Sequence, residues 1–92
     1  MKTNGNWLRL LRIRANIKQD DLAARLQLKG FNITRGSVSH WENGRHTPPL
    51  HDPAFRLALS EALHVDERAM LRFAGYQVEP TQYSEISERI AA

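Results

Sequence analysis

Apolar residues recur every three or four positions through most of the chain, which is the spacing of one face of an α-helix. No segment alternates apolar and polar residues over the length of a β-strand. The pattern predicts a compact all-α domain of five helices. We expect a first helix, capped by Asn4 or Asn6, that runs to about residue 15, and further helices over residues 19–26, 34–43, 53–63 and 67–74.

Residues suited to helix ends separate these segments. Asp52 followed by Pro53 is typical of an N-cap and first turn, and Asp66 can cap the fifth helix. Asn16 and Gly75 suit the left-handed backbone that often ends a helix. We therefore expect the apolar stripes between these signals, which end with Ala69, Met70 and Phe73, to form the core.

Residues 34–43 carry the most informative polar pattern. At about 100° per residue, Val38 and Trp41 point to one side of this helix, which Thr34 can cap. An arc of about 140° on the other side is shared by Arg35, Gly36, Ser39, His40 and Asn43. Such polar side chains can bond base edges and phosphate oxygens, and an α-helix fits the major groove of DNA. DNA is the first partner to consider, although a helix face that only contacts water is the alternative for this window alone.

The neighbouring sequence favours DNA as the partner over a helix face that only contacts water. Gln-Asp-Asp-Leu-Ala starts at residue 19, and Ser-Val-Ser-His-Trp-Glu-Asn-Gly-Arg starts at residue 37, followed by Pro48. These runs resemble the helix-turn-helix of the phage-repressor Cro/CI-type (Xre-like) family over residues 8–75. The resemblance implies a repressor-like DNA-binding domain.

The resemblance also implies roles for single residues. Base reading falls on Arg35, Gly36 and His40, with Ser39 beside them. Phosphate contacts fall on Gln19, Ser37, Asn43 and Arg45. Arg12 and Glu42 occupy positions that form a structural clamp in the family.

Two departures from the family pattern matter. Residues 27–33 replace a tight turn, and we expect Gly30 to turn the chain while Leu28, Phe31 and Ile33 enter the core. Lys29 is then left free to reach a phosphate. Gly36 has no side chain, so base preference depends on Arg35 and His40, and a guanine in each half-site is expected.

Charge is unevenly distributed along the 92 residues, whose net charge is +3. Residues 1–45 hold nine Lys or Arg and three Asp or Glu, whereas residues 46–92 hold four and seven. The basic half is therefore the half with the helix-turn-helix pattern, as expected for a protein that binds a polyanion.

Composition narrows the class of protein. The chain has no cysteine, so it has no disulfide and no thiolate metal site. No stretch approaches the roughly 20 apolar residues that span a membrane, and the N-terminus lacks a secretory signal. We expect a cytoplasmic, nucleoid-associated protein without a membrane partner.

The last segment has a different character. Residues 1–75 form the predicted DNA-binding domain, and residues 76–92 a linker followed by a sixth, C-terminal helix. Its stripe of Tyr83, Ile86 and Ile90 can pack back on the domain or contact a dimer or protein partner. Dimerisation is expected because one recognition helix reads few base pairs, and a two-fold dimer would read an inverted repeat in double-stranded DNA.

Catalysis is not expected from this sequence. The four histidines lack the spacing of a helical zinc site, and no Gly-rich phosphate loop or hydrolase motif is present, so neither a metal nor a cofactor is predicted. The function predicted is a sequence-specific transcriptional regulator of the repressor type. The alternative is an antitoxin or adaptor of the same fold that acts through its C-terminal segment.

Overall fold

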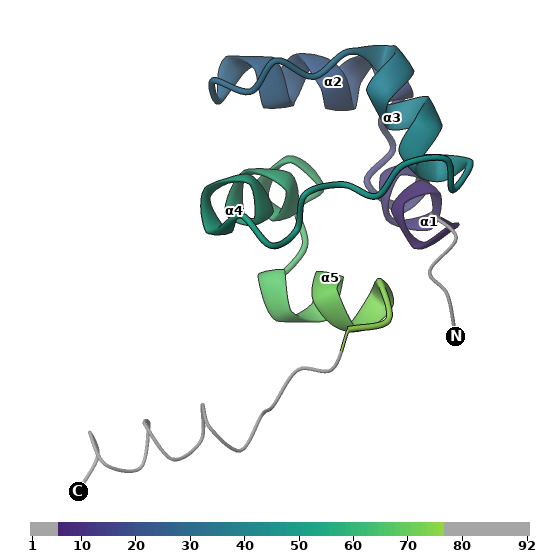
Figure 1. The fold of residues 1–92 in the computed structure, drawn as a ribbon, viewed down its shortest axis with the longest axis vertical. Coiled ribbons are helices and arrows are strands. Elements are labelled where there is room, and N and C mark those ends of the chain that lie inside the picture. Colours follow the sequence, from purple (N-terminus) through teal and green to yellow (C-terminus); the bar gives the residue numbers. More distant parts are fainter. Residues whose placement is uncertain (1–5, 77–92) are drawn as a thin grey trace, which may run out of the picture.

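A computed structural model describes residues 6–76 of the chain, and within this range it contains five helices and no strand. The helices are α1 (Asn6–Arg14), α2 (Gln19–Leu28), α3 (Arg35–Glu42), α4 (Pro53–Ala62) and α5 (Glu67–Phe73). Figure 1 shows α2 and α3 joined by a loop that runs back along α2, with α4 below α2 and α5 furthest from α2. The predicted all-α fold is confirmed.

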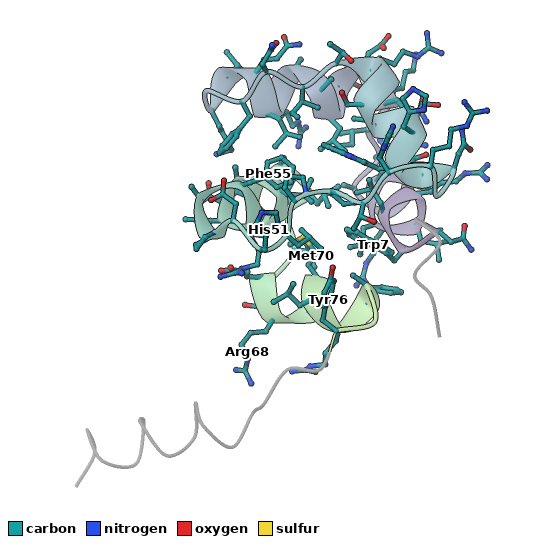
Figure 2. The ribbon with its side chains drawn as sticks, viewed as in Figure 1. Trp7, His51, Phe55, Arg68, Met70 and Tyr76 are labelled. Atoms are coloured by element: carbon teal, nitrogen blue, oxygen red, sulfur yellow. The ribbon has the colours of Figure 1, made fainter. Side chains whose placement is uncertain are left out.

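One apolar core lies between the helices. The fully buried Phe55 of α4 makes edge-to-face ring contacts with Trp41 of α3 and Phe31 of the α2–α3 loop. Figure 2 shows Trp7, Phe55 and Met70 directed into the interior from α1, α4 and α5. Because every helix contributes to this core, α3 is held by packing on one side along its length.

The helix ends form as the cap residues predict. Ser37 donates its backbone N–H to the hydroxyl of Thr34 at 3.2 Å, and Ala54 donates its backbone N–H to the Asp52 carboxylate at 3.1 Å. Asn16 adopts a left-handed φ of 62°, which lets the chain turn sharply after α1. These local contacts fix the starts of α3 and α4 and the end of α1.

Three expectations about packing are corrected. Helix α2 continues to Leu28, beyond the predicted residue 26, and Leu28 is 88% exposed rather than buried. The turn at Gly30, with φ of 94°, reverses the chain after Leu28, so that Phe31 and Ile33 pack against the core instead. Phe73, the last residue of α5, is 49% exposed rather than part of the core.

Candidate nucleic-acid interface

Helix α3 has one anchored face and one exposed face. Val38 is fully buried and Trp41 is 6% exposed, so these two side chains fix the helix to the core. Around the opposite side lie Arg35, Gly36 and Asn43, all exposed, with Ser39 and His40 half-buried. The predicted polar arc is therefore presented outward from a rigid base.

Arg35 starts α3 and reaches towards α2. Its Nε lies 3.5 Å from a carboxylate oxygen of Asp20, and both side chains are about 70% exposed. The ion pair uses Nε, and the guanidinium also carries two terminal amino groups. Two such amino groups are what a bidentate contact to guanine requires.

His40 is positioned by the segment that follows α3. Its ring packs edge-to-face against that of His46, with 5.3 Å between centroids. Its backbone carbonyl accepts the N–H groups of Arg45 at 2.9 Å and His46 at 3.3 Å. The chain after Gly44 is thus tied to the last turn of α3, which brings exposed Arg45 beside the polar arc.

A buried ion pair lies behind the arc and joins three helices. The Arg12 guanidinium of α1 donates two hydrogen bonds to the Glu42 carboxylate, at 2.6 and 3.1 Å, and a third to the carbonyl of Ile17. The side-chain amide of Gln19, the first residue of α2, also donates to Glu42, at 3.1 Å. The Arg12 and Glu42 pair implied by the resemblance is thus present, and it holds the start of α2 against the end of α3.

The other predicted phosphate-contacting residues lie at the ends of these helices. Ser37 shares the N-terminal cap of α3 with Thr34, and Asn43 donates its side-chain amide to the Ser39 hydroxyl at 3.4 Å. Helix N-termini carry a partial positive charge and free N–H groups, so the beginnings of α2 and α3 suit phosphate oxygens. These assignments remain predictions.

Lys29 does not have the freedom expected of it. Its Nζ lies 2.8 Å from the Glu61 carboxylate on α4, in an ion pair whose two side chains are both exposed. The residue is therefore engaged where we expected it to be free, and its phosphate contact remains a prediction.

Sequence reasoning missed two residues of this surface. These residues are Asp20 and His46, for which the sequence predicted no contact with the polar arc. The sequence offered one indication of their role, which is nearness along the chain to predicted site residues. Asp20 directly follows Gln19, and His46 lies six residues after His40. Their contacts with Arg35 and His40 depend on how α2, α3 and the following loop pack.

Within residues 6–76 no group of three or more His, Cys, Asp or Glu side chains is arranged to hold a metal ion. In the same part of the chain, no helix has the length and apolar character to cross a membrane. The predicted partner contacts Tyr83, Ile86 and Ile90 lie outside the described residues.

Comparison with known proteins agrees with this geometry. A family model described as a helix-turn-helix domain matches residues 5–73. This covers most of the chain, which therefore belongs to the helix-turn-helix domain family, consistent with the Cro/CI-type resemblance. No curated protein and no solved structure gives a match.

Proposed function

We propose that this member of the helix-turn-helix family is a sequence-specific regulator of transcription, which represses by occupying an operator in double-stranded DNA. The observation that carries the proposal is the polar arc of α3, exposed on a helix whose other face is fixed by Val38 and Trp41. A helix held in this way can enter the major groove without losing its orientation.

Base reading falls to the exposed side of α3. Arg35 supplies a planar pair of donors that matches the O6 and N7 acceptors of guanine, and His40 with Ser39 reads the neighbouring base edges. Gly36 lies between them and lets the backbone come close to the bases. A good bidentate contact contributes about 1–3 kcal/mol of discrimination, so Arg35 dominates the preference.

Phosphate contacts set the position of the protein on DNA. Gln19 keeps a second amide N–H beyond the one given to Glu42, and this group can donate to a phosphate at the start of α2. Ser37, Asn43 and Arg45 flank the ends of α3, where the two DNA strands pass. Each phosphate neutralised adds about −0.9 to the slope of log affinity against log salt.

We further propose that two copies bind together on an inverted repeat. A single recognition helix reads only a few base pairs, whereas two helices about 34 Å apart read successive major grooves on one side of the duplex. Neither a cofactor nor a catalytic step is part of this proposal, and a nucleoid-associated location would follow from it.

The experiment is selection of bound sites from a random duplex library at low and moderate salt. Enrichment of an inverted repeat with a guanine in each half-site supports the proposal. Salt-sensitive binding without an enriched motif contradicts sequence-specific reading. Complete lack of binding contradicts DNA recognition and favours the adaptor or antitoxin function.

A further inference from the structure

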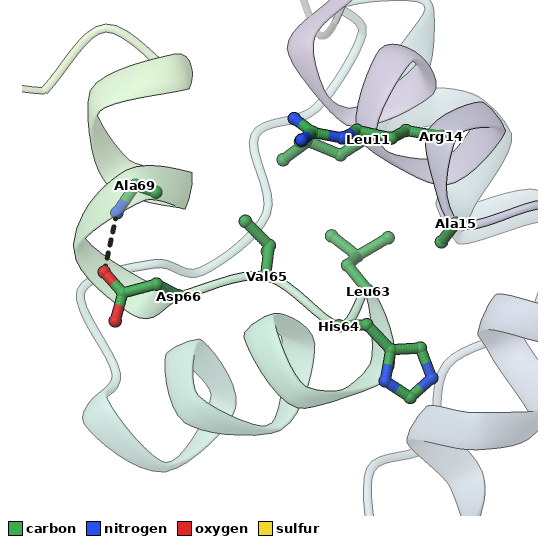
Figure 3. Close-up of a pocket in the computed structure, with 8 residues that line it drawn as sticks. All are labelled: Leu11, Arg14, Ala15, Leu63, His64, Val65, Asp66 and Ala69. Carbon is green, nitrogen blue, oxygen red and sulfur yellow. Dashed lines mark hydrogen bonds between the residues drawn. The ribbon is translucent and has the colours of Figure 1, made fainter.

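A groove unrelated to the polar arc lies between the end of α1 and the turn that joins α4 to α5. Its volume is about 400 Å³. Figure 3 shows Leu11, Leu63 and Val65 projecting into it, whereas His64 points away. Leu63 and Leu11 are almost fully buried and form its floor, while Val65 is only partly covered. The groove is therefore a hollow of mixed polarity, which has Leu11, Leu63 and Val65 at its centre and the charged Arg14 and Asp66 in its lining.

Apolar surface continues beyond this hollow along both helices. Arg14 and Ala69 line the groove from α1 and α5. Leu10 lies one turn before Arg14, and Phe73 lies one turn after Ala69, so each shares a helix face with a lining residue. Leu10 is 50% and Phe73 49% exposed, although both are large apolar side chains. Leu10 and Phe73 therefore add exposed apolar area near the groove, which a short amphipathic helix can cover.

We propose that residues 82–92 of the same chain bind in this groove as a sixth helix. Tyr83, Ile86 and Ile90 recur at helical spacing and give this segment one apolar face. A helix of 11 residues is marginal by itself in water, so such a face needs a surface to pack on. The apolar centre of the groove, formed by Leu11, Leu63 and Val65, provides such a surface.

Chain geometry and charge both favour this occupant. The chain leaves α5 near Tyr76, and residues 77–81 can span up to about 17 Å, more than the roughly 10 Å length of α5. Residues 77–92 carry three Glu and one Arg, a net charge of −2, whereas residues 6–76 carry eleven Lys or Arg and seven Asp or Glu, a net charge of +4. At the groove itself Arg14 and Asp66 contribute opposite charges, so the attraction comes from the net charge of residues 6–76.

Tethering explains why a groove of this size is enough. A separate protein needs an interface of about 1,200–2,000 Å² for a stable complex, much larger than this hollow and its rims. A segment joined by a short linker has an effective concentration near the millimolar range, so a small contact is sufficient. The occupant that the groove fits is therefore a segment of the chain itself.

Because the chain has no cysteine, a disulfide can form only between cysteines that are introduced. Ala69→Cys is combined in turn with cysteine at a stripe position, Tyr83, Ile86 or Ile90, or at an off-stripe position, Glu85 or Glu88. Each full-length variant is oxidised at low protein concentration. The rate of disulfide formation and the size of the product are followed on non-reducing gels. A matched series carries His51→Cys, in a separate hollow near Tyr76, in place of Ala69→Cys.

The docked helix predicts monomeric products in which at least one stripe position reacts about tenfold faster than both off-stripe positions, because docking fixes which face meets the groove. The same preference should disappear in urea. Equal rates at all five positions would overturn the proposal, since an undocked segment has no preferred face. Disulfides that form only between two chains, or faster with His51→Cys, would overturn it as well. None of these readings depends on DNA binding.

Discussion

The ion pair between Arg12 and Glu42 is the contact whose loss should cost the fold most. The side chains are 13% and 5% exposed, so neither charge can be fully solvated if the other is removed. Glu42→Leu leaves the Arg12 guanidinium with the carbonyl of Ile17 as its remaining acceptor among residues 6–76 and also removes the acceptor of the Gln19 amide. Breaking a buried pair from one side costs about 3–5 kcal/mol, and partial exposure of Arg12 lowers the expected cost to about 2–4 kcal/mol.

The assay is equilibrium unfolding in urea, with thermal unfolding as a second measure. For a domain of this size, a loss of 1 kcal/mol lowers Tm by about 4–8 °C, so Glu42→Leu should lower it by at least about 8 °C. The double variant Arg12→Met with Glu42→Leu removes both charges and should recover much of this loss.

The matched control is Glu61→Leu, which removes the partner of Lys29 in an exposed ion pair. Such pairs contribute about 0–1 kcal/mol, so this change should be nearly neutral. Equal small effects of Glu42→Leu and Glu61→Leu would refute the reasoning. A double variant no more stable than Glu42→Leu alone would refute it too, because the cost would then not come from an unpaired buried charge.

Three further predictions concern α3 and the turn before it. Arg35→Ala should relax the base preference in selected sites, whereas Arg45→Ala should weaken all duplexes alike and reduce the salt slope by about 1; equal effects on all sequences would contradict this division. Gly36→Ala should raise stability to urea by about 0.5–1 kcal/mol while weakening binding to the selected site, because a Cβ there meets only Thr34 Oγ1, at 3.5 Å, but would face the bases. Leu28→Ser should leave the urea midpoint unchanged, whereas Leu26→Ala should cost about 2–5 kcal/mol, and similar losses for both would mean that Leu28 is buried.

Features encoded within a few residues could be predicted from the sequence. The cap at Thr34, the left-handed turn at Asn16 and the anchoring of α3 by Val38 and Trp41 all depend on local spacing. The exposure of Leu28 depends on where the chain reverses, which the helical pattern does not specify. The link from Lys29 to Glu61 joins residues 32 positions apart, and only the packing of α2 on α4 brings them together.

The candidate site divides in the same way. The polar arc followed from helical spacing, but the Arg12 and Glu42 pair, 30 positions apart, could be expected only from resemblance to a family. Asp20 beside Arg35 was not predicted by either route, because it arises from the relative placement of α2 and α3. The sequence therefore predicted which face of α3 is polar and exposed. The ion pair between Arg35 and Asp20 could be found only from the structure.

The buried ion pair connects stability with recognition. Glu42 accepts from Arg12 of α1 and from Gln19 of α2, and it is itself the last residue of α3, so one carboxylate fixes the relative placement of three helices. The proposed phosphate donor at the start of α2 and the proposed base readers on α3 are thereby held in one geometry. The extended loop of residues 29–34 does not need to set this angle, since the clamp acts at the opposite end of α2. This separation explains how the chain can carry a longer turn than its family pattern and still present a single rigid recognition surface.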